Sequence, residues 1–345
     1  MINIPQEIQT DLRQIEVVAN DLKMKAYVVG GFPRDIVMGI EITNESDLDL
    51  TEANGNAFDL AFFVAAKYNL PEPQIYELSG TAMIIMPSGR MIEFHNAYHN
   101  VSHIIDQLYV MGVEPTPINK DVFSRDFTIN TLLFDIETQE IIDLTGKGIE
   151  DIRNRYLRTP LTPAKTLAIE PKRLLRGMRF EVQFDMRVDP AYEKEIPNFL
   201  PYLVSFMQTH PDSKMVRATV EKTFQANPQK ALEEFKKWDL IKFLPKTDEM
   251  DKVLKGDLFG MSVTPAASSY FDPIKTAQTR MIQYLMQERE KHKAYMRRKR
   301  REEAQKREEK FDILEKAKTG YYTNNPLDGI NLPKKKNRGY ENVAG

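Results

Sequence analysis

The spacing of hydrophobic positions changes along the chain and predicts which segments are helices and which are strands. Residues 5–24 carry apolar side chains three or four positions apart, the spacing of a helix with one buried face. Short apolar runs at residues 27–29 and 47–51 have the length and alternation of strands. Residues 56–68 are strongly apolar and predict a core helix, and residues 72–94 predict a meander of three strands. These segments together predict a sheet covered by helices.

The second part of the chain has a helical pattern with short loops. Residues 215–238 predict two helices that break at an Asn-Pro pair, and residues 280–318 predict a long, highly charged helix with few apolar positions. These changes in pattern divide the chain into three regions: a mixed head over residues 1–145, a helical neck over residues 146–245, and a charged helical extension with a flexible tail over residues 246–345.

Composition narrows the class of protein. With 345 residues, of which 41% are hydrophobic, the chain is long enough to form two or three domains. The absence of cysteine excludes disulfides, thiolate metal sites and thiol nucleophiles, and it agrees with a reducing compartment. No apolar run approaches the length of a membrane span, and the N-terminus lacks the pattern of a signal peptide. We therefore expect a cytoplasmic protein with no membrane partner.

Charge is distributed unevenly along the chain. The net charge of −2 gives no overall basic signature, but residues 288–318 hold 13 Lys and Arg against 8 Asp and Glu. The basic block at residues 297–301 could bind RNA phosphates without sequence specificity. A plain solvated helix explains this block equally well, so its role stays open.

Residues 27–51 contain a predicted phosphate-binding turn. Gly30 and Gly31 end a strand and leave backbone N–H groups open to an anion, because neither residue has a Cβ. A helix that begins near Pro33 would point its N-terminus at the same anion. Arg34 can add a bidentate phosphate contact. The turn therefore predicts a cradle for phosphate groups.

Two carboxylates follow this turn. Asp47 and Asp49 lie two positions apart on a predicted strand, so their side chains project from one face, where they repel each other unless a divalent cation lies between them. Mg²⁺ prefers a few carboxylates together with substrate phosphate oxygens. An acidic pair at this spacing is expected roughly seven times by chance in such a composition, so the pair alone is a weak signal. Its position after a phosphate cradle predicts nucleotidyl transfer with two Mg²⁺ ions; the alternative is a turn followed by a solvated strand edge.

The sequence GGFPRD followed by DLDLT resembles the head of the polymerase β-type nucleotidyltransferases. More narrowly, it resembles the class II tRNA CCA-adding enzymes and the bacterial poly(A) polymerases. The resemblance implies an α+β nucleotidyltransferase head, a mixed sheet with flanking helices, followed by an all-α neck; here a charged helical C-terminal extension follows. It implies that Asp47 and Asp49 are catalytic and hold Mg²⁺, and that Gly30, Gly31 and Arg34 bind the nucleotide.

A third carboxylate lies on the last strand of the predicted meander. The resemblance implies that Glu93 joins the aspartates as a catalytic residue, although a solvent-facing strand Glu is an equally good interpretation. His95, His99 and His103 are spaced four apart, but no carboxylate completes a convincing cluster, so we do not predict a histidine metal site. Tyr98 lies near the place where the family has a basic residue.

A second block, SRDFTIN, resembles the family sequence RRDFTIN. By this resemblance Asp126 would accept hydrogen bonds from the ribose hydroxyls and Arg125 would bind the nucleotide. Ser124 replaces the first arginine of the family sequence, which removes one positive group near the triphosphate. The alternative is a capped strand start that is held by an internal Arg–Asp pair.

A third block over residues 168–180 predicts a helix with an apolar stripe and a basic ridge. Its arginines, Arg173, Arg176 and Arg179, recur every three positions, which is also the pattern of a solvated face. The block resembles the family pattern EDxxRxxR, which implies that Glu170 and Arg173 bind the edge of the incoming base and that Arg176 helps to bind the nucleotide. Glu170 replaces the family Asp, so the choice between CTP-then-ATP and ATP alone stays open.

The resemblance therefore implies a template-independent RNA nucleotidyltransferase. The first expectation is the addition of CMP and AMP from CTP and ATP to the 3′ end of a tRNA, with the release of pyrophosphate. One alternative is a poly(A) polymerase that acts on general RNA 3′ ends. A second alternative is a non-catalytic RNA-binding protein with a degenerate head, although the intact aspartate pair argues against it.

Overall fold

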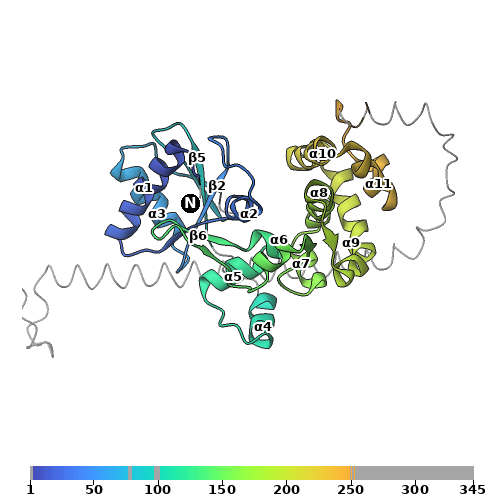
Figure 1. The fold of residues 1–345 in the computed structure, drawn as a ribbon, viewed down its shortest axis with the longest axis horizontal. Coiled ribbons are helices and arrows are strands. Elements are labelled where there is room, and N and C mark those ends of the chain that lie inside the picture. Colours follow the sequence, from blue (N-terminus) through green and yellow to red (C-terminus); the bar gives the residue numbers. More distant parts are fainter. Residues whose placement is uncertain (1–2, 77–79, 97–101, 249, 251, 253–345) are drawn as a thin grey trace, which may run out of the picture. The chain divides into compact units, whose positions relative to one another are not determined.

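The computed structural model describes residues 3–76, 80–96, 102–248, 250 and 252 (Figure 1). Contacts between Cα atoms divide the chain into two units, residues 1–278 and residues 279–345, and every described residue belongs to the first. The predicted charged helix and its basic block at residues 297–301 lie outside the described residues. No helix in the described part of the chain is long and apolar enough to cross a membrane.

The head is built on one seven-stranded sheet. Its strands are β1 (Ala26–Val29), β2 (Leu48–Glu52), β3 (Gln74–Tyr76), β4 (Thr81–Ile85), β5 (Met91–His95), β6 (Leu133–Asp135) and β7 (Ile141–Ile142), in the spatial order β3-β4-β5-β2-β1-β6-β7. Strands β2 and β5 pair in parallel, whereas every other neighbouring pair is antiparallel. The predicted mixed sheet and the three-stranded meander are confirmed.

The alternation of side chains gives the sheet two different faces. Leu48 and Leu50 in β2 are buried in a core that includes residues of α1 (Gln6–Asp21) and α3 (Ala57–Lys67). The intervening residue of β2, Asp49, therefore points to the other face, where it pairs with Val29 of β1. The two covering helices lie side by side in Figure 1 and contact each other. The face opposite these helices is the one that carries Asp49.

The helix α2 (Gly31–Met38) follows β1 directly. Phe32 of α2 packs edge-on against Phe134 of β6, with ring centroids 5.4 Å apart, and this contact fixes the start of the helix against the sheet. The helix ends at Gly39, which has φ of +71° as a left-handed C-cap. The first turn of α2 is thereby held next to the end of β1.

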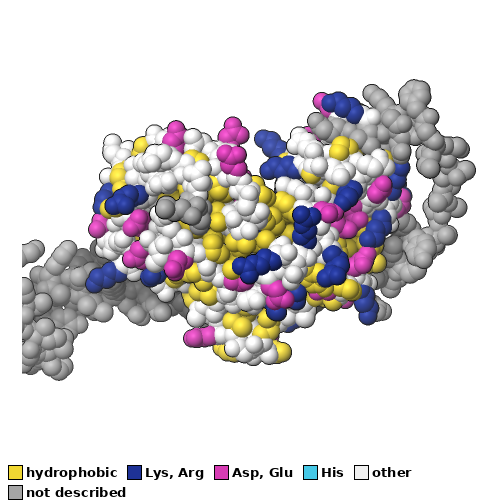
Figure 2. Space-filling view, viewed as in Figure 1, with side chains coloured by type: hydrophobic (Ala, Val, Ile, Leu, Met, Phe, Trp, Pro, Cys, Tyr) yellow, Lys and Arg dark blue, Asp and Glu magenta, His cyan; other side chains and the backbone are white. Residues whose placement is uncertain are grey.

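A second, smaller core lies on the Asp49 face. It contains Val29 and Leu133 from the sheet with Val122 and Phe123 from α5 (Pro117–Ser124) and residues of α4 (Ser102–Val110). The short 3-10 helix η1 (Thr128–Asn130) connects α5 to the sheet. In the view of Figure 2 hydrophobic side chains gather at the centre and, in a smaller group, over α4, and Lys and Arg side chains are interspersed with Asp and Glu around them.

The neck is helical, as predicted. Its helices are α6 (Gly148–Arg153), α7 (Pro163–Ile169), α8 (Arg173–Phe184), α9 (Pro190–Thr209), α10 (Lys214–Ala226), α11 (Pro228–Lys237) and η2 (Ile241–Phe243). The break between α10 and α11 is at Asn227, as the Asn-Pro pair predicts, and the Asn227 side chain caps α11. One small parallel pair, β8 (Tyr156–Leu157) with β9 (Arg187–Val188), is added to the helices.

The single helix predicted over residues 168–180 is wrong. The chain leaves α7 at Ile169 and adopts an extended conformation at Glu170, with φ of −156° and ψ of 105°, before α8 begins at Arg173. The cause is Pro171, because the ring of a proline disfavours helical backbone at the residue before it. Glu170 and Arg173 are therefore on different elements.

Candidate active site

Two carboxylates meet on neighbouring strands of the sheet. Asp49 of β2 lies directly opposite Glu93 of β5 in the parallel register, so both side chains project from the face that α1 and α3 leave uncovered. Burial, the charge of Asp49 and, less strongly, that of Asp47 raise the pKa of the Glu93 carboxyl. Asp47 is exposed and lies one residue before β2. The face thus concentrates negative charge that a cation would neutralise.

His95 completes this cluster, contrary to expectation. Its Nε2 atom lies 3.5 Å from Asp49 Oδ1 and 3.5 Å from Glu93 Oε2. The spacing of His95 with His99 and His103 did not reveal this, and neither of those side chains is described. The useful signal was the spacing of two between Glu93 and His95, because residues i and i+2 of a strand share a face.

The predicted phosphate turn lies directly beside Asp49. Gly30 has φ of +77° and ψ of −121°, a conformation that side chains rarely adopt. A Cβ at this position would lie 3.3 Å from Asp49 Oδ2 and 3.6 Å from Arg125 Nη1. A carboxylate and a guanidinium thus flank Gly30, and the missing side chain leaves room between them.

The two arginines near this turn are held by other side chains. Arg125 donates from Nη2 to Asp121 Oδ2 at 3.0 Å, and its Nε is buried with no partner among the described residues. Arg34 is buried, and it donates from Nη1 to Asn130 and from Nε and Nη2 to Asp35. Its Nη2 atom lies 3.3 Å from the place that a Cβ of Gly31 would occupy. Because Asp35 takes two of its donors, a phosphate at Arg34 can use only the remaining ones.

Asp126 is a buried, ionised carboxylate. It accepts hydrogen bonds from Arg176 Nε at 2.6 Å and from Asn130 Nδ2 at 3.0 Å. Burial alone would raise the pKa of Asp126, but the guanidinium groups of Arg176 and Arg173 and the bond from Asn130 hold it well below its usual range. Both residues form internal Arg–Asp pairs, Arg125 with Asp121 and Asp126 with Arg176, so the structural interpretation of this segment stays open beside the nucleotide-binding one.

Comparisons with known proteins agree with this geometry. Residues 26–158 match the poly(A) polymerase head domain. The chain is 33% identical over 129 residues to the tRNA nucleotidyltransferase cca2 of Schizosaccharomyces pombe. The matched segment covers 37% of this chain and 26% of that protein. The chain is 24% identical over 266 residues to the A-adding tRNA nucleotidyltransferase of Geobacter sulfurreducens, which covers 73% of this chain and 29% of that protein.

A solved structure with the same fold is the Thermotoga maritima CCA-adding enzyme complexed with tRNA. It superposes with a TM-score of 0.56 at 25% identity, and the match covers 75% of this chain and 58% of that one. Residues 26–158 therefore resemble the poly(A) polymerase head domain in sequence, and the chain is similar in fold to a CCA-adding enzyme. It spans less than a third of the length of the two curated relatives above.

The candidate base-binding residues of this chain are not arranged as one ridge. Arg173 is buried and donates to the backbone carbonyls of Ser124 at 2.6 Å and of Arg125 and Thr166 at 3.3 Å. Glu170 forms an ion pair with Lys172 and stays partly exposed. The solvated-face interpretation of the arginines is therefore wrong: Arg173 anchors α8 to the end of α5.

Arg179 adds a cation that we did not predict as a site residue. Its guanidinium lies 4.5 Å from the centre of the Phe180 ring, and its Nε is buried with no partner among the described residues. Burial and the positive charges of Arg176 and Arg34 lower the pKa of Arg179 to about 10. Three guanidinium groups therefore gather around Phe180, beside the carboxylate of Asp126.

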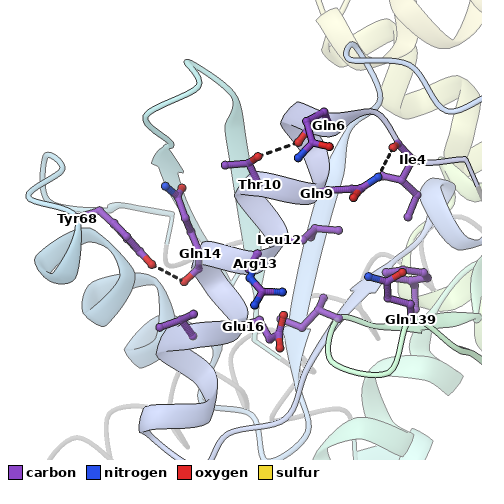
Figure 3. A pocket seen from close by; sticks show the side chains of 13 residues that line it. Ile4, Gln6, Gln9, Thr10, Leu12, Arg13, Gln14, Glu16, Tyr68 and Gln139 are labelled. Carbon is purple, nitrogen blue, oxygen red and sulfur yellow. Dashed lines mark hydrogen bonds between the residues drawn. The ribbon is translucent and has the colours of Figure 1, made fainter.

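The cluster on the sheet fits a divalent cation. Asp49, Glu93 and His95 each offer one ligand atom, and these atoms lie within 4.8 Å of one another. By contrast, a pocket of about 470 Å³ between α1 and the end of β6 is lined by none of the site residues (Figure 3). The hydrogen bonds drawn there, from Gln9 to the carbonyl of Ile4, from Thr10 to the carbonyl of Gln6 and from Tyr68 to the carbonyl of Gln14, are internal to the helical face. We therefore place the candidate site on the opposite face of the sheet.

Proposed function

We propose that this protein transfers nucleoside monophosphates from CTP and ATP to the 3′-hydroxyl of a tRNA and releases pyrophosphate. The observation that carries the proposal is the pairing of Asp49 with Glu93 across two parallel strands, directly beside the side-chain-free Gly30. A carboxylate cluster next to an open backbone turn can hold a metal-bound triphosphate. The names of the relatives support tRNA as the acceptor.

Different residues of the chain would bind the phosphates and the ribose of the nucleotide. Gly30 and Gly31 would admit the triphosphate, and Arg125 and the remaining donors of Arg34 would bind it. Asp126, kept ionised by Arg176, would accept hydrogen bonds from the ribose hydroxyls.

Asp47 and Asp49, with Glu93, would hold Mg²⁺. When bound, these ions would activate the attacking hydroxyl and neutralise charge on the triphosphate. The ordered turn and the crowded carboxylates support this function over a degenerate, non-catalytic head. A cytoplasmic location, expected for a chain without cysteine, stays a prediction.

Base selection would fall to Glu170, Arg173 and Arg176. Glu170 keeps a hydrogen-bond acceptor for the exocyclic amine of cytosine or adenine. The buried Arg173 would act by positioning α8, and Arg176 would act from the edge of the Asp126 pair. Addition of A alone is the second candidate, because two relatives are named A-adding tRNA nucleotidyltransferases and one of them covers 73% of this chain.

The test uses the purified full chain with Mg²⁺ and tRNA transcripts that end before CCA, before CA or before A. We expect CTP and ATP together to add two C and one A to the shortest transcript. If only the transcript that lacks the final A is extended, and only by ATP, the protein is an A-adding enzyme. A ladder of A residues on unrelated RNA would indicate a poly(A) polymerase. Absence of transfer by folded protein with every substrate would overturn the proposal.

A further inference from the structure

We infer that Asp49, Glu93 and His95 form a mixed oxygen and nitrogen site for a divalent transition-metal ion, with the His95 imidazole as a direct ligand. The inference rests on the proposed function for the use of the ion. Such a site differs from one made only of carboxylates, because its imidazole ligand would favour ions such as Mn²⁺, Co²⁺ and Zn²⁺ over Mg²⁺.

The strands bring the three side chains together without any loop. Asp49 and Glu93 are partners in the parallel register of β2 and β5, and His95 follows Glu93 by two positions on the same face. A site built on adjacent strands holds its ligands more rigidly than a site on loops. The ligand atoms therefore converge before any ion binds.

Two of the three distances between ligand atoms are close to the edge of a tetrahedral coordination polyhedron, and all three atoms lie within 4.8 Å of one another. His95 Nε2 lies 3.5 Å from an oxygen of Asp49 and 3.5 Å from an oxygen of Glu93. Ligands about 2.1 Å from one tetrahedral ion lie about 3.4 Å apart, and those of an octahedral ion lie about 3.0 Å apart when adjacent. The observed separations are long for hydrogen bonds. They fit a shared ion better than direct bonds between the imidazole and the carboxylates.

The imidazole is also oriented from its far side. Thr81 Oγ1 lies 3.3 Å from His95 Nδ1, and Thr51 Oγ1 donates to the backbone carbonyl of His95 at 3.1 Å. When Nδ1 carries the proton and donates it to the buried Thr81 hydroxyl, the lone pair of Nε2 faces the two carboxylates. Ligating histidines are held in this way by a hydrogen bond to the other ring nitrogen.

The choice of ion follows from the ligand types. Carboxylate oxygens suit Mg²⁺, Ca²⁺ and Mn²⁺, whereas an imidazole nitrogen favours first-row transition metals such as Zn²⁺. For one set of ligands affinity rises from Mn²⁺ to Co²⁺ along the transition series. Replacement of one oxygen ligand by His95 therefore favours the transition-metal ions at the expense of Mg²⁺.

The competing explanation is that a protonated His95 serves only as a counter-charge to Asp49 and Glu93. In that case the imidazolium would oppose the ion, and its removal would strengthen the binding of every divalent cation. The two explanations predict opposite effects of the same substitution, so ion binding decides between them.

The experiment titrates the full chain with Co²⁺, without nucleotide or RNA, and follows the visible absorption of the bound ion, whose position and intensity report its ligands and geometry. We expect His95→Ala to weaken Co²⁺ binding at least about tenfold and to shift this spectrum, as loss of a nitrogen ligand requires. Mg²⁺ affinity, measured by competition with Co²⁺, should change by less than about threefold. Since no transfer reaction is measured, an inactive protein would not affect the result.

Three further variants complete the test. Thr81→Val should weaken Co²⁺ binding by about tenfold while His95 remains present, and His95→Gln, which keeps the side-chain volume, should behave as His95→Ala does. His210→Ala, in α9's C-cap and stacked on Phe206, should leave Co²⁺ binding unchanged. Equal or tighter Co²⁺ binding by folded His95→Ala and His95→Gln would overturn the proposal and assign His95 as a counter-charge.

Discussion

Asp49 is the residue of the sheet on which the proposed metal binding most depends. Asp49 contacts Glu93 through the strand register and lies against the Cβ position of Gly30. We expect Asp49→Asn to reduce nucleotide transfer at least about a hundredfold, because a neutral amide cannot hold the metal and its charge. The thermal unfolding temperature should change little, since Asp49 has no hydrogen bond that an amide would leave unsatisfied among the described side chains.

The control is Asp59→Asn, an exposed carboxylate in the first turn of α3 on the helix-covered face. It should transfer nucleotides at the wild-type rate. Normal transfer by Asp49→Asn would contradict the assignment, and unfolding of that variant would show that Asp49 has a structural role.

Gly30 allows a second test at a single residue. Alanine there would strain the backbone by about 1–3 kcal/mol, because ψ of −121° takes Gly30 outside the left-handed helical region. It would also place a methyl group 3.3 Å from Asp49 Oδ2, in the space we assign to phosphate. Gly39→Ala is a matched control, because Gly39 also has positive φ, of +71°, but a Cβ there meets nothing within 4 Å. We expect both variants to lose stability in a denaturant titration and only Gly30→Ala to lose transfer. Equal activity of the two variants would remove the phosphate role of the turn.

Between elements, the contact of α8 with α9 depends on one glycine. A Cβ at Gly177 of α8 would overlap the hydroxyl of Tyr192 in α9 and lie 2.9 Å from Phe127. Alanine favours a helix over glycine by about 1 kcal/mol, but overpacking of this kind costs about 1–3 kcal/mol. We therefore expect Gly177→Ala to lower the free energy of unfolding, measured by denaturant titration.

The Tyr192 hydroxyl supplies the internal control for this contact. It is buried with no hydrogen-bond partner among the described residues, so Tyr192→Phe should be neutral or stabilising. In the double variant the phenylalanine should recover part of the loss caused by Gly177→Ala. If the two effects simply add, the hydroxyl is not what crowds position 177.

The helix break at Glu170 shows what local sequence could and could not predict about elements. Pro171 was a sufficient signal for the end of α7, yet the stripe of leucines favoured one continuous helix. The spacing of the arginines correctly predicted that α8 is a helix, but it did not predict that Arg173 is buried. Arg173 is buried because carbonyls of Ser124 and Arg125, nearly fifty residues away, need donors.

Across the whole molecule, stability should depend on pH through buried acids in the neck. Burial and the neighbouring Glu234 raise the pKa of Glu181 to about 7, with Glu193, Lys230 and Lys237 as the other charged neighbours. Between the ordinary pKa and this value the folded chain binds more protons than the unfolded chain. The contribution of Glu181 to stability is therefore present in acid and lost as the pH rises through 7.

We expect Glu181→Gln to weaken this pH dependence. The wild-type protein should lose about 1–3 kcal/mol of this contribution between pH 5 and pH 8, and the variant should lose less of its stability, as measured by Tm at each pH. Glu233→Gln, at an exposed position of α11, is the control and should keep the wild-type dependence. Identical pH profiles for Glu181→Gln and wild type would contradict the raised pKa of Glu181.

The sequence predicted the mixed sheet, the helical neck and most of the candidate site, because hydrophobic alternation and the glycine turn are local signals. It did not predict that His95 joins Asp49 and Glu93. That contact depends on the register between β2 and β5, which are separated by two strands and a helix in the sequence. Register across such a distance is set by packing of the whole sheet, not by residues near the site.

The parallel pairing of β2 with β5 also sets the order in which the protein can become functional during synthesis. β1 and β2, which are separated only by α2 and a loop, can pair early, but Asp49 has no carboxylate partner until β5 has been made and has paired with β2. Non-local pairings of this kind form late in folding. Ion binding at the proposed site would therefore require the completed sheet, and a divalent ion would favour the finished head over its precursors by mass action.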